Sequence, residues 1–227
     1  MPRLNNSVLW IGSVVILISF ILALAINQRL KIRAYMRNFF LFPLIGLLLS
    51  TNTILSRFFF TYGDEVFYPI QSLLDLLSLC FWAHFFLNVF VNKNDLVKIR
   101  ILFVSTVVTA IGLYIFSNHK QSNLHLLSVM NICNTIFCIF FYYRLFKRVP
   151  NQDIRFEPCF WVIAGLFFYS SLSLPFYSLN DYIRVTFPAI AMYILAISNM
   201  MIIIMYFFFI KACICTVRLH REHRTLL

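Results

Sequence analysis

Charged residues are scarce in this chain of 227 residues. They make up 12% of the sequence, against 61% hydrophobic residues, whereas soluble domains average about 25% charged and about 45–50% apolar residues. Glycine occurs only five times, and there are only eight acidic residues. This composition excludes an ordinary water-soluble globule, and the 27 phenylalanines suit helices that face lipid as well as one another. We predict an all-α membrane protein embedded in a lipid bilayer.

Familiar catalytic and metal-binding motifs are also missing. The sequence has no GxxxxGK[ST] phosphate loop and no HExxH motif. Cys213-Ile214-Cys215 lacks the two-residue spacing and the second ligand pair of a zinc site, so we interpret the cysteines as small packing residues. No set of nucleophile, base and oxyanion donor can be assembled from the polar residues of the spans. We therefore predict neither an enzyme nor a metal or organic cofactor.

Seven apolar stretches are long enough to cross a bilayer, which takes about 20 residues within a range of about 17–25. Pro175 and several serines interrupt the end of the sixth stretch. We predict a seven-transmembrane-helix bundle that forms a single integral membrane domain over residues 1–227, ending in a basic cytoplasmic tail over residues 211–227. The predicted spans are 7–26, 39–60, 69–91, 101–117, 125–143, 158–178 and 187–210.

Lysine and arginine collect in alternate loops, which predicts the orientation because these residues favour the cytoplasmic side. The loops after the first, third and fifth stretches and the tail after the seventh hold four, three, four and four of the 19 basic residues. The N-terminus is therefore predicted outside and the C-terminus in the cytoplasm, in a cell membrane of bacterial cytoplasmic type. This topology and anionic headgroups account for the net charge of +11, so we predict no nucleic-acid partner.

A secretory signal peptide is the alternative interpretation of the first apolar stretch. Ala23-Leu24-Ala25 is a small-x-small pattern like a signal-peptidase site. Cleavage there would place the following basic loop outside and invert the charge pattern of all later loops. We therefore interpret residues 7–26 as a retained helix.

Asp75 is an acidic residue within the third stretch, about 9 Å from its outer end at Pro69 at roughly 1.5 Å per residue. A charge inside a membrane is unfavourable and is expected to face the bundle interior and find a partner. Arg57, near the outer end of the second stretch, is the predicted partner in an ion pair. The alternative is that Arg57 reaches the lipid headgroups while Asp75 stays protonated and uncharged.

Polar residues concentrate toward the predicted outer face of the membrane. In the third stretch the spacings of four, three and four residues place one set on a common helix face: Gln71, Asp75, Ser78 and Trp82. Serines of the sixth stretch lie at a comparable depth. These observations predict a polar pocket open to the outside, with a ligand that the sequence leaves unidentified. Its candidate residues are Arg57, Gln71, Asp75, Ser170 and Ser171.

Other polar residues within the spans are interpreted as interhelical hydrogen-bonding groups, which contribute about 0.6 kcal/mol per contact on average. His84 lies on the side of its helix opposite Asp75 and pairs by its spacing of four with Asn88. A histidine at this depth is more often a packing residue than a metal ligand. The full set comprises Asn52, His84, Asn88, Asn131, Asn134 and Asn199.

The last two stretches carry a family resemblance. The sixth opens with an FW-x3-G-x3-Y phrase, and the seventh has an asparagine seven residues before a tyrosine and then a lysine and a cysteine at its exit. The positions are Phe160, Trp161, Gly165, Tyr169, Asn199, Tyr206, Lys211 and Cys215. This pattern resembles small, mostly uncharacterised bacterial seven-helix membrane proteins and the membrane sensor modules of some histidine kinases. Because no kinase domain follows here, the resemblance implies a free-standing sensor or accessory unit.

We therefore expect an integral membrane protein of sensory or accessory type, which passes a signal to a separate protein. A histidine kinase or another membrane-associated protein is the expected partner. The alternative is a small transporter or channel with a polar site around Asp75 and Arg57. Carriers usually bind substrate near the midplane on broken helices, and five glycines offer few such breaks. A retinal protein is disfavoured, because the seventh stretch has no lysine at its centre.

Overall fold

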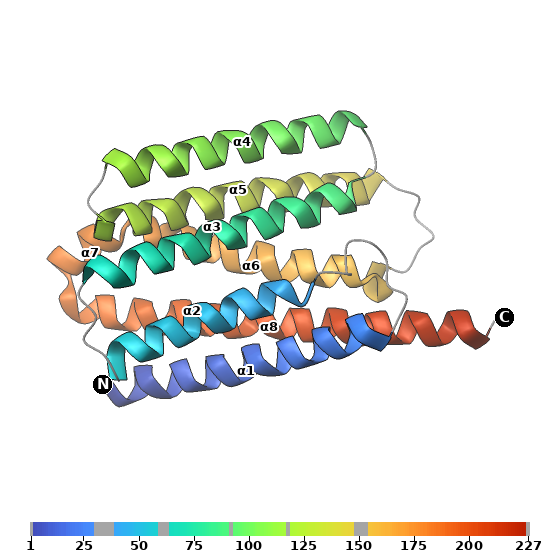
Figure 1. Ribbon diagram of the computed structural model, residues 1–227, viewed down its shortest axis with the longest axis horizontal. Coiled ribbons are helices and arrows are strands. Elements are labelled where there is room, and N and C mark those ends of the chain that lie inside the picture. The colour runs from blue at the N-terminus through green and yellow to red at the C-terminus, as the bar shows by residue number, and fades with distance from the viewer. Residues whose placement is uncertain are drawn as a thin grey trace.

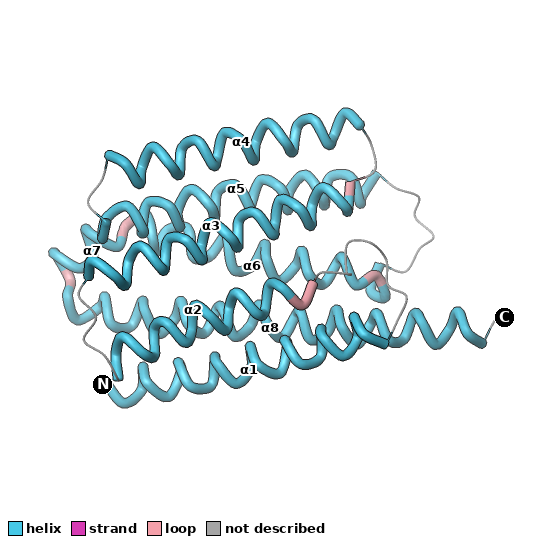
Figure 2. Tube along the Cα trace, in the orientation of Figure 1, coloured by secondary structure: helices cyan, strands magenta, loops and turns pink. Residues whose placement is uncertain are grey.

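The computed structural model describes residues 2–29, 39–58, 64–90, 93–116, 119–147 and 154–225. Within these ranges every regular element is a helix, as Figure 2 shows, so the prediction of an all-α protein is confirmed. The elements are α1 (Pro2–Arg29), α2 (Leu41–Phe58), α3 (Asp64–Val89), α4 (Lys93–Phe116), α5 (His119–Lys147), η1 (Ile154–Phe156), α6 (Pro158–Ser178), α7 (Asn180–Thr186) and α8 (Pro188–Thr225).

Six helices in the described ranges are long and apolar enough to cross a membrane, so the protein is a multi-pass membrane protein. The remaining predicted span, 39–60, forms α2, whose described apolar part Leu41–Ile54 is shorter. At about 1.5 Å per residue, the 18 residues of α2 are about 27 Å long, close to the roughly 30 Å of a hydrocarbon core. The six spans are Ser7–Gln28, Pro69–Val89, Leu96–Leu113, His125–Lys147, Pro158–Ser178 and Ala196–Leu219.

The helices lie where the spans were predicted, but several of them begin or end at other residues than predicted. α6 begins and ends as predicted, whereas α8 continues to Thr225 and so includes most of the predicted tail, 211–227. Hydropathy marks where lipid ends, but a helix continues until the chain interrupts it, and residues 211–225 contain neither proline nor glycine. α3 likewise begins at Asp64, before the predicted start at Pro69, which lies inside the helix.

Successive long helices run in opposite directions along one axis, and the two termini lie at opposite ends of the molecule (Figure 1). α8 packs along α1 and α6, α6 packs on α5, α5 on α3, and α2 lies between α1 and α3. These six helices form a closed ring. α4 packs on α3 and α5 and is not one of the ring helices.

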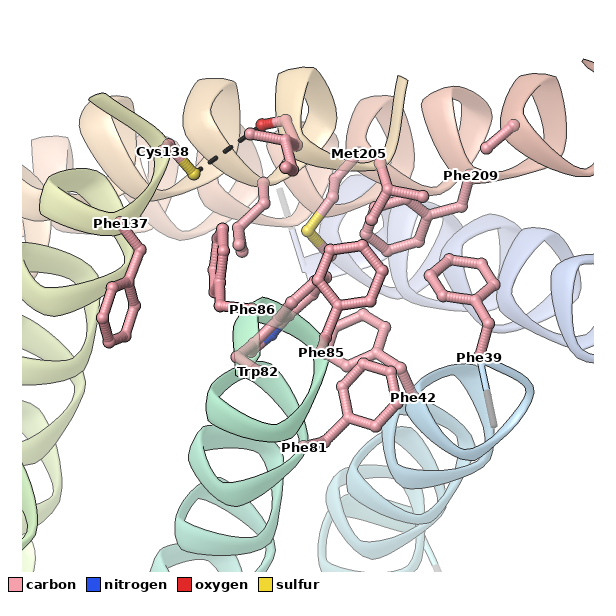
Figure 3. Close-up of a cluster of buried hydrophobic side chains, with 14 of the residues drawn as sticks. Phe39, Phe42, Phe81, Trp82, Phe85, Phe86, Phe137, Cys138, Met205 and Phe209 are labelled. Carbon is pink, nitrogen blue, oxygen red and sulfur yellow. Dashed lines mark hydrogen bonds between the residues drawn. The ribbon is translucent and has the colours of Figure 1, made fainter. Parts of the chain in front are cut away.

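Aromatic side chains hold one sector of the ring together. The Phe42 ring of α2 lies 4.5 Å from the Trp82 ring of α3 and 5.4 Å, edge to face, from the Phe209 ring of α8, measured between centroids. Figure 3 shows these rings converging from the three helices, with Phe39 beside them. Such pairs contribute about 0.5–1.5 kcal/mol beyond area burial. In a bilayer this matters because lipid removes the hydrophobic drive for helices to associate, so packing must supply it.

Glycine allows α8 to approach two neighbouring helices closely. A Cβ added to Gly165 of α6 would lie 2.8 Å from the Phe208 Cβ and 3.1 Å from the Met205 carbonyl oxygen of α8. Gly46 of α2 lies directly against the hydroxyl of Tyr206. Small residues are the usual means by which membrane helices come together. Gly165 therefore lets α6 and α8 pack closely, and Gly46 leaves room on α2 for the Tyr206 side chain.

Candidate functional site

A cavity of about 130 Å³ lies within the six-helix ring. Each of the six helices contributes at least one lining residue, and no described residue of α4 takes part. Most of the wall is apolar: Ile16 from α1, Leu166 from α6 and Met205 from α8 are examples. The polar side chains that reach it are Ser50, Asp75, Ser78, Asn131, Asn134, Tyr169 and Tyr206.

α3 brings Asp75, Ser78 and Trp82 to the cavity, because spacings of three and four residues place them on one helix face. Asp75 is 5% exposed, and its Oδ2 atom has no hydrogen-bond partner among the described residues. Trp82 is almost fully buried and joins the cavity to the aromatic cluster. Burying a carboxyl group without a hydrogen bond costs free energy, so this position is one that a ligand can stabilise.

Two asparagines of α5, the helix next to α3 in the ring, line the same cavity. Asn131 and Asn134 are 3% and 4% exposed and lie about one turn apart. The Nδ2 atom of Asn131 and the Oδ1 atom of Asn134 lack partners within the part of the chain that the structure describes. Both line the cavity, and the interhelical hydrogen bonds expected of them stay a prediction. α3 and α5, which pack together, thus supply three side chains with unused hydrogen-bonding capacity.

Two tyrosines complete the polar part of the wall. The Tyr169 hydroxyl of α6 lies 3.4 Å from that of Tyr177 on the same helix. The Tyr206 ring of α8 stacks on the Phe42 ring with centroids 5.9 Å apart. We did not predict Tyr206 as a lining residue, because a tyrosine in an apolar helix is as typical of packing as of a site.

The pocket predicted from the sequence and this cavity overlap at Asp75. Gln71, Ser170 and Ser171 are not among the lining residues. The Gln71 Oε1 atom accepts a hydrogen bond from Asn52 Nδ2 of α2 over 3.4 Å. Ser171 donates to the backbone of its own helix one turn earlier, over 2.7 Å. Ser170 is fully buried, and its hydroxyl has no partner among the described residues.

The other predicted polar residues occupy different surroundings. Arg57 belongs to α2, but its side chain lies outside the described residues, so its ion pair with Asp75 stays a prediction. Asn199 is half-buried on α8. Asn88 Nδ2 lies 3.1 Å from His84 Nε2 on the exposed side of α3. This contact is the one that the spacing of four predicts, because that spacing places the two side chains one turn apart on a single helix. An interhelical contact of either residue stays a prediction.

A concave, mostly apolar space with a few convergent polar groups is the usual form of a small-molecule site. No group of three or more His, Cys, Asp or Glu side chains among the described residues could hold a metal ion. Comparison with protein-family models, curated proteins and solved structures gives no match. The chemistry of the cavity is therefore the basis for assigning a function.

Proposed function

We propose that this protein is a sensory or accessory unit of a cell membrane, which binds a small ligand within the six-helix ring and passes a signal to a separate protein. The observation that carries the proposal is the cavity in which Asp75, Asn131 and Asn134 each have a polar atom without a partner among the described residues. Buried polar groups are normally hydrogen-bonded. A ligand that supplied the missing partners would be bound with both affinity and specificity.

The proposal includes seven crossings with the N-terminus outside and the C-terminus in the cytoplasm. The alternating helix directions and the opposite positions of the two termini in Figure 1 support an odd number of crossings. The basic residues support the orientation, because Arg144 and Lys147 end α5 at the same end of the molecule as Arg218 of α8. Such clusters favour the cytoplasmic side.

α8 offers a route from the cavity to the partner. Met205 and Tyr206 line the cavity, and the same unbroken helix continues to Thr225. Figure 1 shows its C-terminal part projecting beyond the other helices. The Arg218 guanidinium lies 4.4 Å from the centroid of the Phe156 ring in η1, so α8 also contacts the segment between α5 and α6. A ligand that binds one packing of α8 better than another shifts the population between them.

Site-specific photo-crosslinking in the native membrane tests this proposal. We expect a photoreactive residue at Arg218, on the exposed end of α8, to attach one signalling protein such as a histidine kinase. The same residue at Val104, which is exposed on α4 within a candidate span, should attach lipid alone. The adduct at position 218 should also change in yield when Asp75 is replaced by asparagine. Adducts that are the same at both positions, or unaffected by Asp75→Asn, would contradict the proposal.

Transport is the second candidate function, and the buried carboxyl group of Asp75 is the observation that favours it. Acidic residues within membrane helices mark proton and ion pathways in many carriers. Under this alternative, purified protein in liposomes would acidify or alkalinise the interior when a proton or solute gradient is applied, and Asp75→Asn would abolish the flux. Liposomes that show no flux, together with a specific adduct at Arg218, would decide for the sensory unit.

A further inference from the structure

The hydrogen-bonding capacity that the cavity leaves unused indicates a ligand rich in donors. Two of the atoms without a partner in the described part of the chain, Asp75 Oδ2 and Asn134 Oδ1, are acceptors when the carboxyl group is ionised, and Asn131 Nδ2 is a donor. An asparagine amide can exchange its oxygen and nitrogen by rotating, so Asn131 can also present an acceptor. A primary ammonium group has three N–H donors and no acceptor. It can therefore satisfy acceptors from α3 and α5 at once.

The charges and rings of the wall favour a cation over a neutral donor. Among the described lining residues Asp75 is the one acidic side chain, and none is basic. Phe42, Trp82 and Tyr206 form a continuous aromatic surface, with the Phe42 ring centroid 4.5 Å from Trp82 and 5.9 Å from Tyr206. The faces of aromatic rings attract cations, most strongly when water is excluded. An ionisable carboxyl group and aromatic faces around one cavity suit an organic ammonium ion better than an anion or a sugar.

The volume of the cavity limits the size of the ligand. An apolar cavity of about 150 Å³ holds a benzene molecule, so a cavity of about 130 Å³ suits a ligand of comparable or slightly smaller size. Isoleucine, leucine and methionine side chains form the rest of the wall and suit a carbon skeleton. We propose that the cavity binds a small primary ammonium ion whose nitrogen contacts Asp75 and Asn134 and whose hydrocarbon part packs against α1, α6 and α8. This assignment rests on the proposed use of the cavity as a ligand site.

Paired ligands that differ only in charge test the assignment. Cyclopentylammonium and cyclopentanol have the same ring, and each has one heavy polar atom. Their binding to the full-length protein in detergent is measured by isothermal titration calorimetry at neutral pH and checked by the shift in the thermal unfolding midpoint. We expect the ammonium to bind about tenfold or more tightly than the alcohol, because charge-assisted hydrogen bonds are about twice as strong as neutral ones. Asp75→Asn should remove this preference, and Ser170→Ala, at a buried position outside the cavity, should retain it.

The outcomes separate the ligand class from the function. Equal or tighter binding of the alcohol, or a preference that survives Asp75→Asn, overturns the ammonium assignment but leaves the cavity as a ligand site. Binding of neither compound also overturns the assignment, and the crosslink at Arg218 then tests the sensory function independently. The comparison of the two compounds on the wild-type protein needs no variant, so it tests the ammonium assignment even if Asp75→Asn does not fold.

Discussion

Replacing Asp75 with leucine should stabilise the unliganded protein, although the replaced residue is buried at a helix contact. The Asp75 Oδ2 atom has no partner among the described residues, and a buried polar atom left without a hydrogen bond costs about 1–3 kcal/mol. The adjoining cavity of about 130 Å³ leaves room for the larger side chain. We expect the free energy of unfolding, measured by denaturant titration in mixed micelles, to rise by about 1–3 kcal/mol, while cyclopentylammonium binding is lost.

Ser170→Ala is the matched control for this prediction. Ser170 is fully buried, its hydroxyl is also unpartnered among the described residues, and it does not line the cavity. The free energy of unfolding of this variant should also rise, without any change in ligand affinity. A fall in stability for Asp75→Leu would mean that Asp75 has a structural partner, and Arg57, the partner predicted from the sequence, would be the first to examine. The account of Asp75 as a ligand-binding group would then be wrong.

Gly165→Ala should have the opposite effect and weaken the bundle. The new methyl group would lie 2.8 Å from the Phe208 Cβ and 3.1 Å from the Met205 carbonyl oxygen. Neither atom is at the flexible end of a side chain, so α6 and α8 must move apart. Overpacking of this kind costs about 1–3 kcal/mol. The displacement would also change the cavity wall at Met205, so we expect a lower thermal unfolding midpoint together with weaker ammonium binding.

The same substitution at a second glycine provides the control for Gly165→Ala. A Cβ added to Gly112 of α4 would meet no described atom within 4 Å. Alanine is better than glycine in a helix by about 0.8–1.0 kcal/mol, so Gly112→Ala should leave stability unchanged or raise it slightly. Equal effects at the two positions would show that helix propensity, rather than the close approach of α6 and α8, determines the outcome.

Much of the architecture can be predicted from hydropathy and residue spacing in the sequence. Continuous apolar stretches predict the positions of the long helices, and α6 begins and ends where its hydropathy does. The spacing of Asp75, Ser78 and Trp82 predicts the face that α3 turns to the cavity. These features depend on residues close together in the chain. The ends of α3 and α8 were predicted less well, because a helix continues beyond the lipid as long as no residue interrupts it.

The cavity itself could not be predicted, because it depends on which helices become neighbours. Asn131 and Asp75 line one cavity although 56 positions separate them in the sequence. The Tyr206 side chain reaches α2 because Gly46 has no side chain at that point, and that contact joins residues 160 positions apart in the sequence. No local pattern distinguishes a glycine that permits such an approach from one in open space, such as Gly112.

The coupling between the cavity and α8 can be measured directly as a distance between two spin labels. Phe146, 77% exposed near the end of α5, and Ile214, 56% exposed on α8, are suitable positions once the exposed Cys80 is replaced by alanine, because the other five cysteines are buried. Electron resonance in lipid nanodiscs then compares the distance distribution with and without saturating cyclopentylammonium. The account predicts that the ligand shifts the distribution and that Asp75→Asn abolishes the shift. The same distribution with and without ligand, at a concentration that saturates the cavity, would contradict it.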